Sequence, residues 1–320
     1  MAIDAMVAGV LGGDRSVLAR AITLIESAKP EHQADAQNLL VKLMPRAGHG
    51  IRIGVSGLPG AGKSTFIDAF GSMLTGQGHK VAVLAIDPSS SRSGGSILGD
   101  KTRMARLAVD PNAYIRPSPT GGALGGVARA TREAIVVCEA AGFDVVLVET
   151  VGVGQSEVAV AAMVDFFLVL MLAGGGDDLQ GIKKGVLEIA DMIAVTKADG
   201  DNAARARESA ADYSHALRIV TPAGAAWVPP VITVSARDNR GLDDVWATIG
   251  RFAAAAKTSG RWQARRTEQQ IRWMWAMVED RLVSDFKSAP GIQSLAARLE
   301  RDITDGAITP TLAAAILLKK

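Results

Sequence analysis

From residue 51 onwards, the chain alternates short apolar runs with longer stretches of helical periodicity. Nearly continuous apolar runs, rich in β-branched residues, occupy 51–55, 81–86, 144–149, 166–172, 191–196 and 231–234. Helical patterns lie between them, for example at 63–75, 127–141 and 242–256. Strands that are apolar on both faces and alternate with helices are typical of a parallel sheet buried under helices. We therefore predict an α/β fold with a mostly parallel central sheet flanked by helices.

Both ends of the chain have a purely helical pattern. Residues 1–45 carry apolar side chains at helical spacing, with breaks at 12–14 and at Pro30. A last helix is expected over 310–318, with Thr309 as its cap and Pro310 as its first residue. We expect an N-terminal helical extension (1–48), an α/β domain (49–257) and a C-terminal helical region (258–320). Within 261–289, one stripe of apolar side chains at helical spacing comprises Ile271, Met274, Trp275, Val278 and Leu282.

Composition excludes several classes of function. The 35 Lys and Arg residues nearly balance the 33 Asp and Glu residues, so the net charge of +2 does not favour nucleic acid as the main partner. One cysteine, Cys138, and four scattered histidines argue against a disulfide framework and a Cys or His metal site. The most apolar run, 166–173, is far shorter than the ~20 residues that cross a bilayer, and the first residues resemble no targeting peptide. We expect a soluble, cytoplasmic protein with no membrane contact.

A phosphate-binding motif follows the first predicted strand. Residues Gly57-Leu58-Pro59-Gly60-Ala61-Gly62-Lys63-Ser64 match the pattern G-x-x-x-x-G-K-[ST], and Thr65 follows. The glycines let backbone N–H groups curl around phosphate oxygens, and the start of the next helix adds its dipole. We expect Lys63 to contact the β- and γ-phosphates and the Ser64 hydroxyl to bind Mg²⁺. With a strand before it and a helix after it, the motif predicts a P-loop NTPase domain.

A second motif indicates guanine rather than adenine. Thr196-Lys197-Ala198-Asp199 closes the run at 191–196 and fits the pattern [NT]-K-x-D. The Asp199 carboxylate can accept hydrogen bonds from guanine N1–H and N2–H₂, a donor pair that adenine lacks. The Lys197 stem can lie over the base. Backbone N–H groups after the next strand can hold the guanine carbonyl, and they belong to Ser235, Ala236 and Arg237. We therefore predict GTP and GDP as the ligands.

Acidic residues close two more predicted strands. Glu149 is expected to hold Mg²⁺ through water, and the N–H of Gly152 to sense the γ-phosphate. Asp87 opens a small, polar, glycine-rich loop of the kind that acts as a switch. Asp100 is a further candidate for Mg²⁺ or water, and Arg103 for neutralising transition-state charge. Spacing alone leaves an ordinary surface role equally open for Asp87, Asp100 and Arg103. A second glycine-rich stretch, 174–184, is either a partner-sensing loop or a plain loop before a helix.

The longer motifs resemble one family closely. They are Gly57–Thr65, Asp87–Ser90, Gly94–Met104, Arg116–Pro119, Glu149–Glu157 and Asp178–Gly185. Over about residues 5–290 the chain is similar to the methylmalonyl-CoA mutase-associated GTPases (MeaB type), formerly named ArgK or LAO/AO transport kinases. The chain differs from the family at Thr196, where Asn is usual and would tether the P-loop more firmly, and in its tail after 290.

The resemblance implies a metallochaperone-type P-loop GTPase that serves the adenosylcobalamin-dependent methylmalonyl-CoA mutase. It would gate cofactor loading, and protect or reactivate the mutase. It also implies a homodimer through the C-terminal helices, with the Trp275 stripe as the expected surface. By motif, Asp87, Asp100 and Glu149 would surround Mg²⁺ and water, and Arg103 lies in the first switch. The loops that would signal to the mutase contain Gln155, Gln180 and Lys183. Because the motifs contain no strong general base, we expect slow hydrolysis that the partner accelerates.

Three other functions remain open. A P-loop kinase of a small molecule or transport protein would need an acceptor pocket with a base, which the sequence does not reveal, and it fits poorly with Asp199. A nickel-insertion GTPase would be expected to carry His tracts or Cys pairs, which this chain lacks. An interaction module without activity is disfavoured because Lys63, Ser64, Glu149 and Asp199 are all present.

Overall fold

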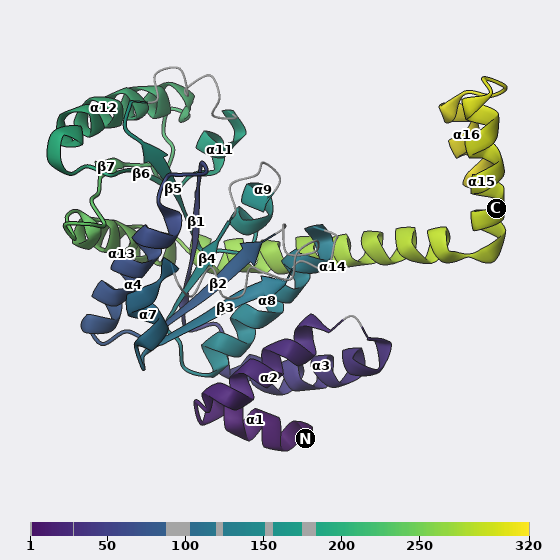
Figure 1. The fold of residues 1–320 in the computed structure, drawn as a ribbon, viewed down its shortest axis with the longest axis horizontal. Coiled ribbons are helices and arrows are strands. Elements are labelled where there is room, and N and C mark those ends of the chain that lie inside the picture. Colours follow the sequence, from purple (N-terminus) through teal and green to yellow (C-terminus); the bar gives the residue numbers. More distant parts are fainter. Residues whose placement is uncertain are drawn as a thin grey trace. The chain divides into compact units, whose positions relative to one another are not determined.

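The centre of the molecule is a sheet with the strand order β3-β2-β4-β1-β5-β6-β7, in which all neighbours are parallel (Figure 1). This computed structural model describes residues 2–27, 29–87, 103–119, 124–150, 156–174 and 184–319. The strands are β1 (Ile51–Gly57), β2 (Val81–Asp87), β3 (Ala113–Pro119), β4 (Val145–Glu149), β5 (Phe166–Leu172), β6 (Met192–Thr196) and β7 (Val231–Thr233). The predicted α/β class with a parallel sheet is confirmed.

Helices bury both faces of the sheet. Along β4, Val146 and Val148 belong to one apolar cluster and Val145 and Leu147 to the other, because alternate side chains of a strand point to opposite faces. The first face is covered by α1 (Ile3–Leu11), α2 (Arg15–Glu26), α3 (Pro30–Leu43), α8 (Leu124–Ala140), α9 (Ser156–Ala161), α11 (Lys184–Ile189) and α12 (Ala203–Val220). The second is covered by α4 (Lys63–Gly76), α7 (Ala105–Val109) and α13 (Leu242–Thr258). This two-sided burial explains the continuous apolar runs of the strands.

One strand, β3, was missing from the predictions made from apolar runs. Its sequence contains Pro117 and Pro119, which have no N–H group to donate to a neighbouring strand. β3 pairs with β2 alone and forms an edge of the sheet. An edge strand tolerates proline because one side of it needs no partner, so its sequence lacks the pattern of a buried strand.

Cα packing divides the chain into two compact units, Met1–Arg266 and Thr267–Lys320. The N-terminal helices belong to the first unit, where α2 and α3 pack against α8. Helix α14 (Arg261–Ser288) leads into the second unit, in which α15 (Pro290–Thr304) and α16 (Pro310–Leu317) pack against each other. As predicted, Thr309 caps α16 by accepting a hydrogen bond from the N–H of Leu312 at 3.2 Å. In the part of the chain that the structure describes, no helix is long and apolar enough to cross a membrane.

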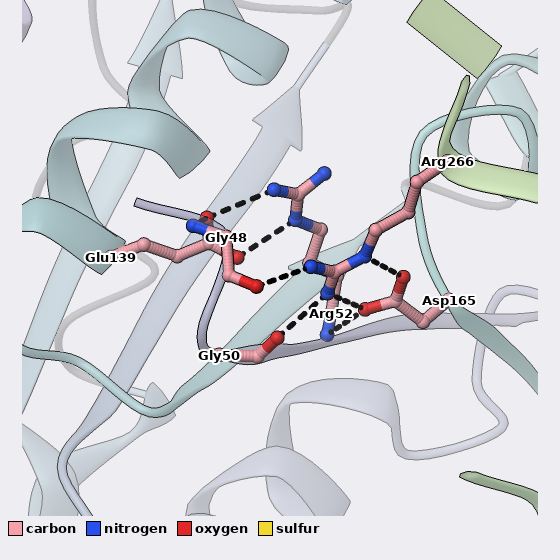
Figure 2. A network of polar contacts seen from close by, with 6 residues as sticks. All are labelled: Gly48, Gly50, Arg52, Glu139, Asp165 and Arg266. Atoms are coloured by element: carbon pink, nitrogen blue, oxygen red, sulfur yellow. Dashed lines mark hydrogen bonds and ion pairs between the residues drawn. The ribbon is translucent and has the colours of Figure 1, made fainter. Parts of the chain in front are cut away.

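A buried charge network lies at the amino ends of β1 and β5, opposite the P-loop (Figure 2). The Arg266 guanidinium donates to both carboxylate oxygens of Asp165, at 2.6 and 2.5 Å. It also donates to the carbonyls of Gly48 and Gly50. Beside it, the Arg52 guanidinium donates to both oxygens of Glu139 at 2.8 and 2.9 Å. Two cations therefore balance two anions, which is the condition for burying them together.

Candidate functional site

The P-loop is the turn that connects β1 to α4, and its backbone requires glycine. A Cβ atom at Gly57 would lie 2.4 Å from the carbonyl oxygen of Leu170, because β1 and β5 approach closely there. Gly62 has a φ of +82°, a left-handed conformation that turns the chain into α4. The Gly62 carbonyl then accepts the N–H of Phe66 at 2.8 Å and begins the helix. The first N–H groups of α4 therefore face the loop, as an anion site at a helix N-terminus requires.

The Lys63 side chain lies against the P-loop itself. Its ammonium donates to the carbonyls of Gly57 at 2.8 Å and of Leu58 at 3.3 Å. Burial lowers the pKa of Lys63 from its usual value, and the nearby carboxylates of Glu149 and Glu157 oppose that shift. The loop thus holds a half-buried cation beside two carboxylates.

Ser64 and Glu149 meet beside the P-loop. In the parallel pairing of β1 and β4, Glu149 stands opposite Val55 and so reaches the carboxyl edge next to the loop. The Ser64 hydroxyl donates to Glu149 Oε1 at 2.9 Å, and only 8% of Glu149 is exposed. A hydroxyl and a carboxylate are oxygen ligands of the type that Mg²⁺ prefers, so this pair fits the ion that the sequence predicts here.

Thr196, at the end of β6, contacts the P-loop through its side chain. Its hydroxyl is buried and lies 2.8 Å from the carbonyl of Ala61 in the P-loop and 3.0 Å from the carbonyl of Met171 at the end of β5. A hydroxyl has one hydrogen, so two acceptors share a single donor. Thr196 makes the contact to the P-loop with fewer donors than an asparagine would have.

The predicted guanine-reading residues come from two loops, one after β6 and one after β7, which a hydrogen bond joins. The Asp199 carboxylate accepts a hydrogen bond from the Ser235 hydroxyl at 2.8 Å, and the Ser235 hydroxyl accepts one from the N–H of Asp238 at 3.1 Å. Lys197 is exposed and has a φ of +57°, an unusual conformation for a lysine. The Asn202 side-chain amide donates to the Lys197 carbonyl at 2.8 Å and stabilises that turn.

The structure describes some of the remaining predicted site residues and leaves others outside the described ranges. Three residues of the P-loop motif are exposed, namely Pro59, Gly60 and Thr65. Arg237, in the loop after β7, and Arg103, just before α7, are exposed as well, while Ala236 is half-buried. For Asp87 the structure describes only the backbone, which ends β2. Outside the described residues lie Asp100, Gly152, Gln155, Gln180 and Lys183. Within the described ranges, no group of three or more His, Cys, Asp or Glu residues is placed to hold a metal ion.

Three described residues near this site were not singled out by the sequence analysis. Glu157 is the last residue of the motif Glu149–Glu157, and Asn202 lies three residues after the end of the Thr196–Asp199 motif. Thr150 donates to the buried Ser56 hydroxyl at 2.9 Å, beneath the P-loop. Asn202 could have been found from its ability to cap a turn, but the burial of Glu157 and Thr150 depends on packing.

Comparison with known proteins places this geometry in a family. The family model described as "Methylmalonyl Co-A mutase-associated GTPase MeaB" matches residues 18–291. A "Putative GTPase" of Caulobacter vibrioides is 56% identical over 316 residues, covering 99% of this chain and 97% of that protein. The mouse (Mus musculus) protein "Methylmalonic aciduria type A homolog, mitochondrial" is 48% identical, covering 99% of this chain and 79% of that protein.

The solved structures agree with the sequence relatives. The crystal structure of an "LAO/AO transport system kinase" superposes with a TM-score of 0.80 at 38% identity, covering 99% of this chain and 96% of that chain. The resemblance that the motifs indicated is thus confirmed by both sequence and fold. The chain belongs to the family of methylmalonyl-CoA mutase-associated GTPases of the MeaB type.

Proposed function

We propose that this chain is a GTP-hydrolysing chaperone of the adenosylcobalamin-dependent methylmalonyl-CoA mutase, which gates cofactor loading and protects or reactivates the mutase. The observation that supports GTPase activity is the hydrogen bond from the Thr196 hydroxyl to the P-loop. This contact brings the P-loop next to the motif proposed to read guanine, at the carboxyl ends of the strands. The partner is supported by the family description, which names association with the mutase, and by the name of the mouse relative, which refers to methylmalonic aciduria.

In this proposal each residue of the site has one task. The P-loop N–H groups and Lys63 bind the phosphates, and the Asp199 carboxylate, oriented by Ser235, accepts the two guanine donors. Ser64 and Glu149 would hold Mg²⁺, which supplies positive charge to the phosphate oxygens. Positioning and charge stabilisation would then supply most of the catalysis.

We infer that hydrolysis is slow in the isolated chain and faster with the mutase. A partner that fixes the switch loops completes the site in other GTPases, and the segments with Gln155, Gln180 and Lys183 are the proposed contacts. Arg103 is proposed to neutralise charge in the transition state.

The proposed assembly is a homodimer formed through α14. The apolar stripe of this helix is exposed in the single chain, with exposures of 52% for Ile271, 57% for Trp275 and 65% for Leu282. Such a stripe on a long helix is the kind of surface that another helix covers.

The decisive experiment measures GTP turnover with and without purified methylmalonyl-CoA mutase, with Lys63→Ala as the control that loses nucleotide binding. Stimulation of at least tenfold in the wild type, absent in the variant, is the expected result. Turnover that the mutase leaves unchanged would refute this partner and keep the GTPase.

Two further measurements distinguish the alternative functions. Transfer of labelled γ-phosphate to an acceptor other than water would favour a kinase. Tight stoichiometric Ni²⁺ binding would favour nickel insertion. Cys138 is a poor ligand for it, because the thiol is buried and burial raises its pKa.

A further inference from the structure

One carboxylate near the P-loop has no task in the site described so far. Glu157, in the first turn of α9, is only 6% exposed. Its Oε2 atom is fully buried and has no hydrogen-bond partner among the described residues. Burying a carboxylate oxygen without a hydrogen-bond partner is costly, so such an atom in a native protein calls for an explanation.

The packing of α9 places Glu157 near the P-loop. Val160, one helical turn after Glu157, packs on β1, since a Cβ built at Gly54 would lie 2.9 Å from Val160 Cγ1. Helix α9 leaves the carboxyl end of β4 and leads to the amino end of β5, so it runs antiparallel to β1. Residues three apart share a helix face. Glu157 therefore lies on the β1-facing side, one turn closer than Val160 to the P-loop end of that strand.

Near the P-loop end of β1, the strand carries a polar side chain on the face that α9 covers. Ser56 and Gly54 point to the same face of β1 because they are two residues apart. The buried Ser56 hydroxyl accepts a hydrogen bond from Thr150. The P-loop end of β1 therefore carries a polar side chain on this face, in contrast to the apolar contact at Gly54.

The electrostatics connect Glu157 to the phosphate site. The Glu157 carboxylate attracts the Lys63 ammonium and favours its charged form. Glu149 does the same, but one of its oxygens already accepts the Ser64 hydroxyl. A buried carboxylate oxygen that no described residue engages thus acts on the lysine that is expected to contact the γ-phosphate.

We propose that Glu157 is a catalytic residue of this GTPase site, whose buried carboxylate oxygen accepts a hydrogen bond from the water that attacks the γ-phosphate. The water oxygen forms a bond to the γ-phosphorus while the bond to the β–γ bridging oxygen breaks, and that electron pair leaves with GDP. The water proton passes to the Glu157 carboxylate and from there to the phosphate product. The inference rests on the proposed GTPase activity and supplies the base that the motifs lacked.

The test is a single-turnover measurement of GTP hydrolysis by Glu157→Gln, with enzyme in excess over GTP. Glutamine keeps the size of the side chain but takes up no proton, so we expect the rate to fall about 100-fold. The dissociation constant of GDP should stay unchanged or decrease, because a negative charge near the phosphates is removed. Glu157→Asp keeps the charge at shorter reach, and we expect an intermediate rate with unchanged GDP binding.

The matched control is Glu133→Gln. Glu133 is also buried, at 2% exposed, but it lies on α8 and pairs with Gln37 at 3.0 Å. Its substitution should leave the hydrolysis rate within a factor of about two.

The outcomes separate the two proposals. A Glu157→Gln rate near that of the wild type overturns the catalytic role and leaves the GTPase intact. Loss of GDP binding together with hydrolysis would show instead that Glu157 only holds Lys63 in place. If Glu157→Gln does not fold, a folded Glu157→Asp variant with the wild-type rate overturns the proposal. A wild-type chain that binds GTP but hydrolyses none with the mutase present refutes the proposed function itself.

Discussion

Removing the hydroxyl group of Thr196 tests how the P-loop is held in place. It is buried and is the only hydrogen-bond donor that this side chain offers to the carbonyls of Ala61 and Met171. Thr196→Val keeps the shape of the side chain and deletes that donor. The P-loop then loses its hydrogen bond to the end of β6.

The size of the effect follows from burial. Leaving a buried polar group without its partner costs about 1–3 kcal/mol. Ala61 belongs to the loop that must hold the phosphates, so part of this cost should appear in nucleotide binding. If about 1.4 kcal/mol does, the dissociation constant of GDP rises about tenfold. Thr196→Asn provides two N–H donors, one for each carbonyl, and should bind GDP at least as tightly as the wild type.

Titration with a fluorescent GDP analogue and thermal unfolding together test this reasoning. Thr75→Val is the control, because Thr75 is also buried but its hydroxyl donates within α4 to Ser72, at the far end from Lys63. The control should lower the midpoint of unfolding without weakening GDP binding. A Thr196→Val variant that binds GDP within a factor of two of the wild type would show that the hydroxyl does not fix the P-loop.

Three further changes have defined outcomes. Asp199→Ala should reduce the preference for GTP over ATP in competition binding by about 100-fold or more, and an unchanged preference would contradict the base-reading role. Arg266→Met leaves the Asp165 carboxylate buried without its cation and should destabilise the fold by about 3–5 kcal/mol in denaturant titration, whereas Arg272→Met, at an exposed pair, should change almost nothing. Equal effects of the two arginine variants would argue against a structural role for the buried pair. Trp275→Glu should convert dimers to monomers in light scattering, and a wild-type chain that is monomeric at micromolar concentration would refute the dimer surface.

Local patterns in the sequence accounted for most of the fold. The strands β1, β2, β4, β5, β6 and β7 coincide with the predicted apolar runs, because a strand buried on both faces must be apolar at nearly every position. β3 was not predicted, because Pro117 and Pro119 break the pattern of a buried strand. These prolines are tolerated because β3 lies at the edge of the sheet.

The candidate site also combines motifs that the sequence revealed with contacts that only the structure revealed. The sequence by itself revealed the P-loop motif, the Thr196–Asp199 motif and the family, since each depends on residues that are close together in the chain. Only the tertiary structure decided that Thr196 contacts Ala61, that Asp165 pairs with Arg266, and that Glu157 is buried near Lys63. These contacts join residues far apart in sequence. Whether such groups meet, and whether water reaches them, depends on how the helices pack on the sheet rather than on any local pattern.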